Sequence, residues 1–478
     1  MTTFEIDERG HFWWADESIP EGHFAPENAV TGLIQVDANG ATKLTLDNVL
    51  SRSPGRPTLD FGASPAGEQE LAAVGLIKRG KEHVRLEQLS NIGLSFGVAQ
   101  HTSEYLRARL CVRGHRLITD LPPNRYCTGI RLSLAGFEEW LQFHNLKLEA
   151  SNAEFAVRIP QLPEKKFELE NATISVGVEV NSRSENPKTA LLLRQEGYLI
   201  YTPKSPMTLD EVRDTVRKLE DLLVLLTDCE RTLGFPQVRI NGADDWSQVS
   251  YETLQRREKE IDRSDLWTTF QNLSPDFGKI ATAWFAKSVE FGPGFHLYLG
   301  NRRGMQLYVE HRFANLGWGL EAFHRSKGEG TSNTALAKKI ERILNAVDKT
   351  DHRWLAGVLK HSGEPNLAQR ILEVLALLPL GFDAAELEKF ANHCAVQRNL
   401  ISHYGGRLDG ESYEKHLSTW ILLSQALDPL YHARILQEIG FPEAEIHRIF
   451  WDISPANRIR DALVRSGLNI HKSKEKAD

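Results

Sequence analysis

Three polar side chains with the means to do chemistry lie within one short segment, Arg398-Asn-Leu-Ile-Ser-His403. Histidine exchanges protons near neutral pH, and arginine binds carboxylates and phosphates. On a helical wheel, Asn399 and His403 are i, i+4 neighbours and can touch. Arg398 falls inside the apolar stripe of the same predicted helix, where a charge is costly unless it is paired or serves a site. The segment is therefore a candidate site.

A purely structural interpretation competes with this one. Arg398 could be a buried arginine paired with a core glutamate, beside a histidine that caps the helix, and for a motif this short such an explanation usually holds. Glu321, on an earlier predicted helix, is a possible partner in either interpretation. Residues five apart also project about 140° from each other on a helix. One helix therefore cannot aim both Arg398 and His403 at one group unless its end unwinds.

The element that must position these residues is a predicted helix over Ala384–Ser402, with Asp383 before it and Gly405-Gly406 after it. The chain is expected to be helical from about residue 303 to its end. Apolar periodicity places the other helices at Met305–Lys327, Ala335–Val347, Arg353–Leu359, Leu367–Leu378, Tyr413–Leu427 (ended by Asp428-Pro429), and about 430–439, 442–450 and 456–466.

The first 200 residues read mainly as strands. Asn39-Gly40 predicts a hairpin between Thr31–Asp37 and Thr42–Asn48, because both turn residues tolerate positive φ. A second turn is expected at Glu8-Arg9-Gly10. Helices are expected near Ser133–Phe143 and, behind the capping box Thr208-Leu-Asp-Glu211, as far as Thr227. Further strands are predicted at His83–Leu89, Tyr105–Val112, Ala156–Ile159 and Thr173–Val180.

This pattern predicts an α+β multidomain protein. A β-rich, sandwich- or barrel-like domain spans residues 1–292, an all-α helical bundle spans 293–468, and 469–478 form a charged tail. Gly292-Pro293-Gly294 is interpreted as the boundary. Residues 295–478 hold 24 Lys and Arg against 22 Asp and Glu, although the whole chain has a net charge of −7. The C-terminal part is thus the less acidic one, which gives mild support for polyanion binding there.

Several classes of protein and site are disfavoured. The four cysteines are scattered without metal-ligand or disulfide spacing, so no metal and no cofactor is expected. The N-terminus lacks an apolar signal core and no apolar run reaches 18 residues. A cytoplasmic protein with no membrane partner is the expectation.

Two regions resemble a known family. Arg398–His403 is similar to the R-x4-6-H motif of HEPN nucleases, and Gly317–Arg325 (GWGLEAFHR) resembles the first HEPN helix of the ApeA-like branch. At the other end, Gly10-His-Phe-Trp-Trp followed by Thr31-Gly-Leu-Ile looks like the ApeA N-terminal domain. The resemblance covers nearly the whole chain. ApeA-like proteins are bacterial antiphage factors that halt growth of the infected cell.

That resemblance implies a HEPN endoribonuclease that cleaves RNA, with tRNA as one candidate substrate, without a metal and leaves a 2′,3′-cyclic phosphate. His403 would be the general acid or base, Arg398 would hold the scissile phosphate, and Asn399 would orient His403 or the phosphate. Glu321 and Arg407 are possible supporting residues. HEPN motifs usually line a dimer cleft, so at least a homodimer is expected, with a phage-derived trigger or ligand at the N-terminal domain.

The competing function is a non-catalytic HEPN protein that binds a ligand or partner and uses the motif structurally. Protein that stays folded and silent towards RNA, together with unfolding on Arg398→Ala, would favour that function.

Overall fold

The structure is a computed structural model of the whole chain. It describes residues 4–50, 72–96, 102–116, 125–143, 147–150, 155–158, 160, 162–183, 192–229, 233–241, 243–253, 260–303, 307–327, 334–359, 364–402 and 412–472. These residues form two compact units. The first comprises residues 1–138, 143–217 and 232–256, and the second comprises 139–142, 218–231 and 257–478.

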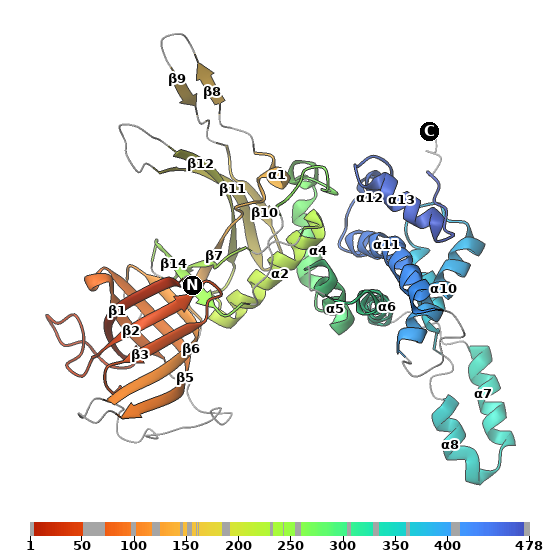
Figure 1. Ribbon diagram of the computed structural model, residues 1–478, viewed down its shortest axis with the longest axis horizontal. Helices are drawn as coiled ribbons and strands as arrows, with labels where there is room; N and C mark the ends of the chain where they lie inside the picture. Colours follow the sequence, from red (N-terminus) through yellow and green to blue (C-terminus); the bar gives the residue numbers. More distant parts are fainter. Residues whose placement is uncertain are drawn as a thin grey trace. The chain divides into compact units, whose positions relative to one another are not determined.

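A closed barrel forms the N-terminal part of the first unit (Figure 1). Its strands are β1 (Phe4–Trp14), β2 (Val30–Asp37), β3 (Thr42–Leu46), β4 (Ala73–Ile77), β5 (Glu82–Phe96) and β6 (Thr102–Gly114). They are hydrogen-bonded in the order β6-β3-β2-β1-β4-β5, and antiparallel pairing of β5 with β6 closes the ring. Alternating apolar residues fill the interior, including Phe12, Trp14, Ile34 and Leu44.

The Asn39-Gly40 hairpin is confirmed. Strands β2 and β3 pair antiparallel around it, and Gly40 has φ +84°, which favours glycine. The turn predicted at Glu8-Arg9-Gly10 is wrong, because β1 runs unbroken through it. Gly10 pairs with Gly32 on β2 and with Ile77 on β4, and a Cβ there would collide with the carbonyl oxygen of Leu76. This glycine permits close packing of strands rather than a reversal of the chain.

The sheet continues beyond the barrel. The first half of β6 is hydrogen-bonded to β3, and its second half is hydrogen-bonded to β14. The order from there is β14-β13-β7-β12-β11-β10, and β8 and β9 form a separate hairpin. The bounds are β7 (Cys127–Ser133), β8 (Lys147–Ala150), β9 (Phe155–Arg158), β10 (Lys165–Glu168), β11 (Ala172–Arg183), β12 (Leu192–Pro203), β13 (Gln237–Ile240) and β14 (Trp246–Tyr251). The barrel-like alternative for the β-rich part is therefore the correct one.

Helix α2 (Leu209–Thr227) begins at the predicted capping box. The Glu211 amide donates to Thr208 Oγ1 at 3.1 Å, and the Thr208 amide donates to Glu211 Oε2 at 2.8 Å. The helix supplies residues to both units. The helix expected near Ser133–Phe143 is much shorter, because Ser133 ends β7 and only α1 (Glu138–Leu141) follows a turn at Gly136, φ +83°.

The second unit is helical apart from its connecting segments. Its helices, in addition to α1 and the second half of α2, are α3 (Phe270–Leu273), α4 (Phe277–Lys287), α5 (Gly292–Arg302), α6 (Val309–Ser326), α7 (Thr334–Ala346), α8 (Lys349–Leu359), α9 (Leu367–Leu375), α10 (Ala384–Ser402), α11 (Tyr413–Glu438), α12 (Glu443–Trp451) and α13 (Ala456–Arg465). Helix α6 packs against α5, α9, α10 and α11 and thus lies at the centre of the bundle. Among the described helices, none is long and apolar enough to cross a membrane.

One of the sequence predictions for this unit needs correction. Pro429 does not end a helix, because α11 runs through it to Glu438. The missing N–H of Pro429 is offset by burial on either side of it, where Leu427, Leu430 and Tyr431 are fully buried. Gly292-Pro293-Gly294, interpreted from the sequence as the domain boundary, lies in the first turn of a helix. Pro293 occupies the first turn of α5, and a Cβ on Gly294 would press on the backbone of Trp318 in α6.

Candidate active site at the end of helix α10

Helix α10 forms with the bounds predicted from the sequence. Asp383 accepts hydrogen bonds from the amides of Ala385 and Glu386, each at 3.0 Å, which satisfies two free donors of the first turn. The apolar stripe of Leu387, Phe390, Ala391, Cys394 and Ile401 is buried, as the helical wheel predicts. The last described residues of the helix therefore project from a fixed base.

Arg398 leaves this stripe towards α6. Its Nη2 lies 2.9 Å from Glu321 Oε2, and its Nη1 donates to Asn399 Oδ1 at 3.2 Å. The side chain of Arg398 is 17% exposed and that of Glu321 is 25% exposed. Both side chains are therefore only partly buried. A guanidinium carries five N–H groups, so each terminal nitrogen keeps one N–H after these two bonds.

Glycine at position 317 makes room for this arrangement. A Cβ there would lie 2.9 Å from Arg398 Cγ, so only glycine lets the arginine stem cross α6 at this point. The next residue, Trp318, lies beneath the guanidinium with its ring centroid 5.9 Å from Cζ. Sequence reasoning missed both roles. The signal was present in the Gly-Trp-Gly triplet, since small residues inside an apolar helix mark a close approach.

An ion-pair chain extends from Glu321 along the surface of the bundle. Arg325 Nη2 lies 3.1 Å from Glu321 Oε1, and Arg325 Nη1 lies 3.0 Å from Glu364 Oε2. Glu364 also pairs with the buried Arg370 at 3.0 Å. The carboxylate that holds Arg398 is therefore itself held by a second guanidinium, which restricts its rotamer.

The neighbouring helix α11 supports the other side of α10. The indole nitrogen of Trp420 donates to Gln397 Oε1 at 3.0 Å, and His416 stacks on the Trp420 ring at 5.7 Å. His393, one turn before Gln397, is exposed, and partial burial lowers the pKa of its imidazole. These contacts fix the segment from which Arg398 and Asn399 project.

The structure therefore brings Arg398, Asn399 and Glu321 together. His403 and Arg407, the other two candidates, lie outside the described residues, as does Tyr404. Asn399 is exposed and contacts Arg398 directly. The resulting cluster offers a positioned guanidinium at the surface with hydrogen-bond donors to spare, which suits binding of an oxyanion such as a phosphate.

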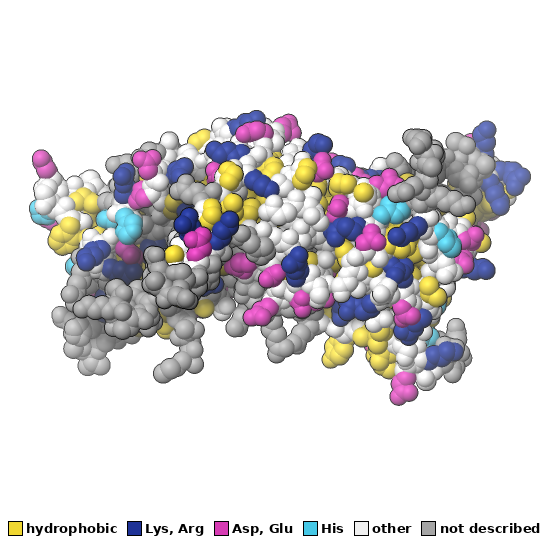
Figure 2. Space-filling model, turned by 90° about the horizontal axis from the view of Figure 1, so that it is seen from above, with side chains coloured by type: hydrophobic (Ala, Val, Ile, Leu, Met, Phe, Trp, Pro, Cys, Tyr) yellow, Lys and Arg dark blue, Asp and Glu magenta, His cyan; other side chains and the backbone are white. Residues whose placement is uncertain are grey.

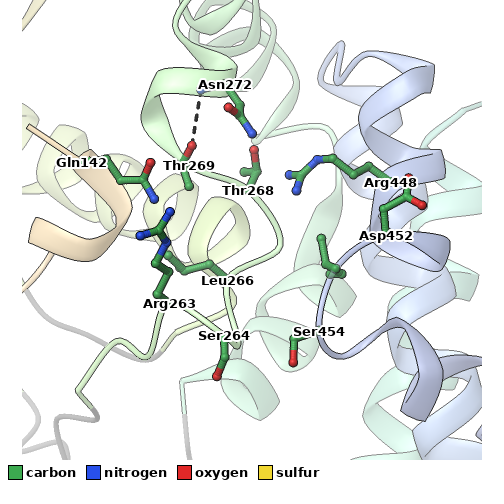
Figure 3. Close-up of a pocket in the computed structure, with 11 residues that line it drawn as sticks. Gln142, Arg263, Ser264, Leu266, Thr268, Thr269, Asn272, Arg448, Asp452 and Ser454 are labelled. Atoms are coloured by element: carbon green, nitrogen blue, oxygen red, sulfur yellow. Dashed lines mark hydrogen bonds between the residues drawn. The ribbon is translucent and has the colours of Figure 1, made fainter.

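A second recess in the helical unit lies between the α3 region and the end of α12 (Figure 3). It encloses about 320 Å³, and the Arg263, Arg448 and Gln142 side chains line it. Arg448 is engaged by Glu445 at 2.9 Å and by the Trp267 carbonyl at 2.5 Å. Asp452 lies 3.7 Å from Lys472. Arg448 and Asp452 are therefore already paired, whereas Arg263 has no ion-pair partner among the described residues.

On the face seen in Figure 2, the described basic and acidic side chains are interspersed, with no broad field of one sign.

Two family models match the chain, the ApeA N-terminal domain 1 over residues 8–284 and the Apea-like HEPN domain over residues 315–445. The first covers more than half of the sequence. The chain belongs to the ApeA family. No curated protein and no solved structure matches it. The β-rich and helical parts predicted from the sequence thus correspond to the two ApeA domains in the predicted order, and the Arg398 cluster lies within the ApeA-like HEPN match. This membership supports an antiphage role for a HEPN-domain protein.

Proposed function

We propose that this ApeA-family protein is an antiphage endoribonuclease, with the end of α10 as its active site and residues 293–468 as its HEPN domain. The observation that carries the proposal is the guanidinium of Arg398, held by Glu321 from a different helix with one N–H free on each terminal nitrogen. A structural ion pair has no need of free donors at the surface, whereas a phosphate-binding group does.

In the proposed reaction the 2′-oxygen of a nucleotide attacks the adjacent phosphorus and the 5′-oxygen of the next nucleotide leaves. One base takes the 2′-hydroxyl proton and one acid protonates the leaving oxygen, so the products are a 2′,3′-cyclic phosphate and a 5′-hydroxyl. Arg398 binds the phosphate oxygens and offsets their developing charge. His403 exchanges a proton at one of the two oxygens, since imidazole titrates near neutral pH. Asn399 orients Arg398.

Because Arg398 and His403 are five residues apart, we propose that the site is completed by a second copy of the chain in at least a homodimer. The N-terminal unit would receive the phage-derived trigger, and tRNA is the proposed substrate class. The reaction as written uses only groups of the protein and the RNA, so we expect cleavage to persist in excess EDTA and to occur in the bacterial cytoplasm.

The test is cleavage of total bacterial RNA by the purified full chain and by the Arg398→Ala and His403→Ala variants. We expect each variant to lose cleavage while it keeps the circular dichroism and melting temperature of the wild type. New RNA ends should carry a cyclic phosphate, which resists 3′ ligation until it is opened. Unchanged cleavage by His403→Ala would contradict the proposal, and an active monomer in analytical ultracentrifugation would contradict the dimer.

A second function has one observation in its favour. Arg398 is mostly buried and is already paired with Glu321, which would also suit a HEPN protein that only binds a ligand or partner. In that case the wild type would be silent towards RNA and Arg398→Ala would lower the melting temperature markedly, because Glu321 would lose its partner.

A further inference from the structure

Helices α7 and α8 form a hairpin that is inserted between two core helices of the bundle. Their contacts are chiefly with each other (Figure 1). Every described side chain from Lys338 to Leu359 is half-buried or exposed. None of these described side chains is buried in the core of the bundle, so packing of the core does not explain the presence of the hairpin.

The described residues on either side of this hairpin are tied to the helical bundle by ion pairs, and one of the two sides is linked to the Arg398 cluster. Lys327, the last described residue before α7, is anchored to Glu438. Glu364, the first described residue after α8, binds Arg325, which in turn binds Glu321, the carboxylate that holds Arg398. Three consecutive ion pairs of 2.9 to 3.1 Å thus join Arg398 to Glu364, the first described residue after the hairpin.

The charge of the hairpin suits a polyanion. Residues 334–359 contain five Lys and Arg against three Asp and Glu, in a chain whose net charge is −7. Lys338, Lys339, Arg342 and Arg353 are all exposed, and none of them has an ion-pair partner among the described residues. Unpaired lysines and arginines on an exposed helix are free to replace the counterions of a phosphate backbone.

The hairpin also presents an aromatic ring to solvent. The side chain of Trp354 in α8 is 68% exposed, whereas Trp13, Trp14, Trp140, Trp284 and Trp420 are almost completely buried. Single-stranded nucleic acids bind to surfaces that combine an exposed aromatic ring with basic side chains, because bases stack on the ring while phosphates contact the charges. The hairpin carries both kinds of side chain.

We propose that the α7–α8 hairpin is an RNA-binding arm that holds the single-stranded nucleotides flanking the cleaved phosphate, with Trp354 as the stacking residue and Lys338 and Arg342 as phosphate contacts. Lys338 and Arg342 are i, i+4 neighbours on α7, so they share one face. The proposal rests on the proposed ribonuclease function and specifies how its substrate is held.

The test measures binding of a fluorescent, unstructured 20-nucleotide RNA by the full chain carrying His403→Ala, which keeps the probe intact. Adding Lys338→Glu and Arg342→Glu should weaken binding at least roughly tenfold and lower the slope of log affinity against log salt by about 1.4, or about 0.7 per lost contact. Trp354→Ala should weaken binding roughly fivefold or more, while Trp354→Phe stays close to the parent because it keeps a stacking face.

The matched control is the double reversal Lys389→Glu and Arg458→Glu. These residues lie on α10 and α13, are exposed, and likewise have no ion-pair partner among the described residues. We expect this control to change affinity less than twofold. If both double reversals weaken RNA binding equally, the effect comes from the overall charge of the protein, and the proposal that the hairpin is an RNA-binding arm is wrong. A hairpin reversal that alters the oligomeric state but not RNA affinity would overturn it too, because the hairpin would then be an interface between copies.

Different results would contradict the proposed RNA-binding arm and the proposed ribonuclease activity. If the wild type does not cleave RNA but the hairpin variants still bind RNA more weakly than the control, the arm stands and the catalytic assignment falls. If the wild type cleaves and the hairpin variants bind and cleave as the parent does, the arm alone is wrong.

Discussion

The guanidinium of Arg398 on α10 is tied to the carboxylate of Glu321 on α6, with 2.9 Å between Nη2 and Oε2. This bond joins two helices that are 77 residues apart in sequence. It fixes the direction of the arginine without using up its donors. Glu321 is therefore a positioning residue for Arg398, and its substitution should affect RNA cleavage more than the stability of the fold.

Glu321→Gln tests that role. We expect the rate of RNA cleavage to fall roughly 10- to 100-fold, because a loosened guanidinium meets the phosphate in the wrong place. The free energy of unfolding should change by no more than about 1 kcal/mol, since both side chains are partly exposed and the pair is screened. Single-turnover cleavage and urea denaturation measure the two effects. Glu388→Gln, at an exposed position on α10, is the control and should change neither.

Gly317→Ala tests the steric side of the same contact. The new methyl group would lie 2.9 Å from Arg398 Cγ and should push the arginine away from Glu321. Cleavage should fall at least roughly tenfold. The free energy of unfolding should change little, because the steric clash lowers it while the better helix propensity of alanine raises it by about 1 kcal/mol. Gly357→Ala on α8 is the matched control, because nothing lies within 4 Å of a Cβ there. Full activity in Gly317→Ala would contradict the arrangement.

His432 makes stability depend on pH. Its ring is fully buried, hydrogen-bonds the Leu225 carbonyl at 2.7 Å and stacks on Trp267. Burial, together with the charge of Arg302, holds the pKa of this imidazole well below its ordinary value of 6.5. The unfolded chain therefore takes up a proton below pH 6.5 that the folded chain refuses. Stability is complete above this pH and is lost as the pH falls, by up to about 1.4 kcal/mol per pH unit.

The measurement is the urea midpoint between pH 7.5 and 5.5 for the wild type and for His432→Gln, which can still donate to the carbonyl but does not titrate. We expect the variant to be less stable at pH 7.5 and its midpoint to depend less steeply on pH. If the urea midpoints of the two proteins fall equally steeply with decreasing pH, another group is responsible for the loss of stability in acid.

The capping box at the start of α2 should have a measurable effect on stability. Thr208→Ala removes the acceptor of the Glu211 amide and should cost about 1 kcal/mol of unfolding free energy. Ser412→Ala is the control at the start of α11, where the serine side chain makes no capping hydrogen bond. A urea titration should therefore separate Thr208→Ala, but not Ser412→Ala, from the wild type.

Local chemistry allowed much of the fold to be predicted from the sequence. The capping box at Thr208 and the Asp383 cap place α2 and α10, and the Asn39-Gly40 turn places β2 and β3. Each of these signals is satisfied within a few residues of chain. The predictions of a turn at Gly10 and of a helix end at Pro429 were wrong for the converse reason. In both cases residues distant in the sequence decide, through packing, whether the glycine or proline interrupts a strand or helix.

The candidate site divides in the same way. The wheel identified Arg398 as an arginine misplaced in an apolar stripe, and Glu321 was named as its possible partner, which the ion pair confirms. The roles of Gly317, Trp318 and Arg325 could not be derived, since they depend on the crossing of α6 and α10. Placing His403 and Arg407 relative to Arg398 depends on residues beyond the described end of α10, so their roles stay predictions.

The close approach of Gly317 to Arg398 also bears on how such a protein can evolve. A mutation that gives position 317 any side chain removes the space for the arginine stem, and a bulky side chain could settle there only after position 398 had become small. Either order passes through an intermediate with a displaced or missing guanidinium. If Arg398 is the phosphate-binding group, that intermediate leaves its host open to infection, so we expect the two positions to change together although their numbers differ by 81.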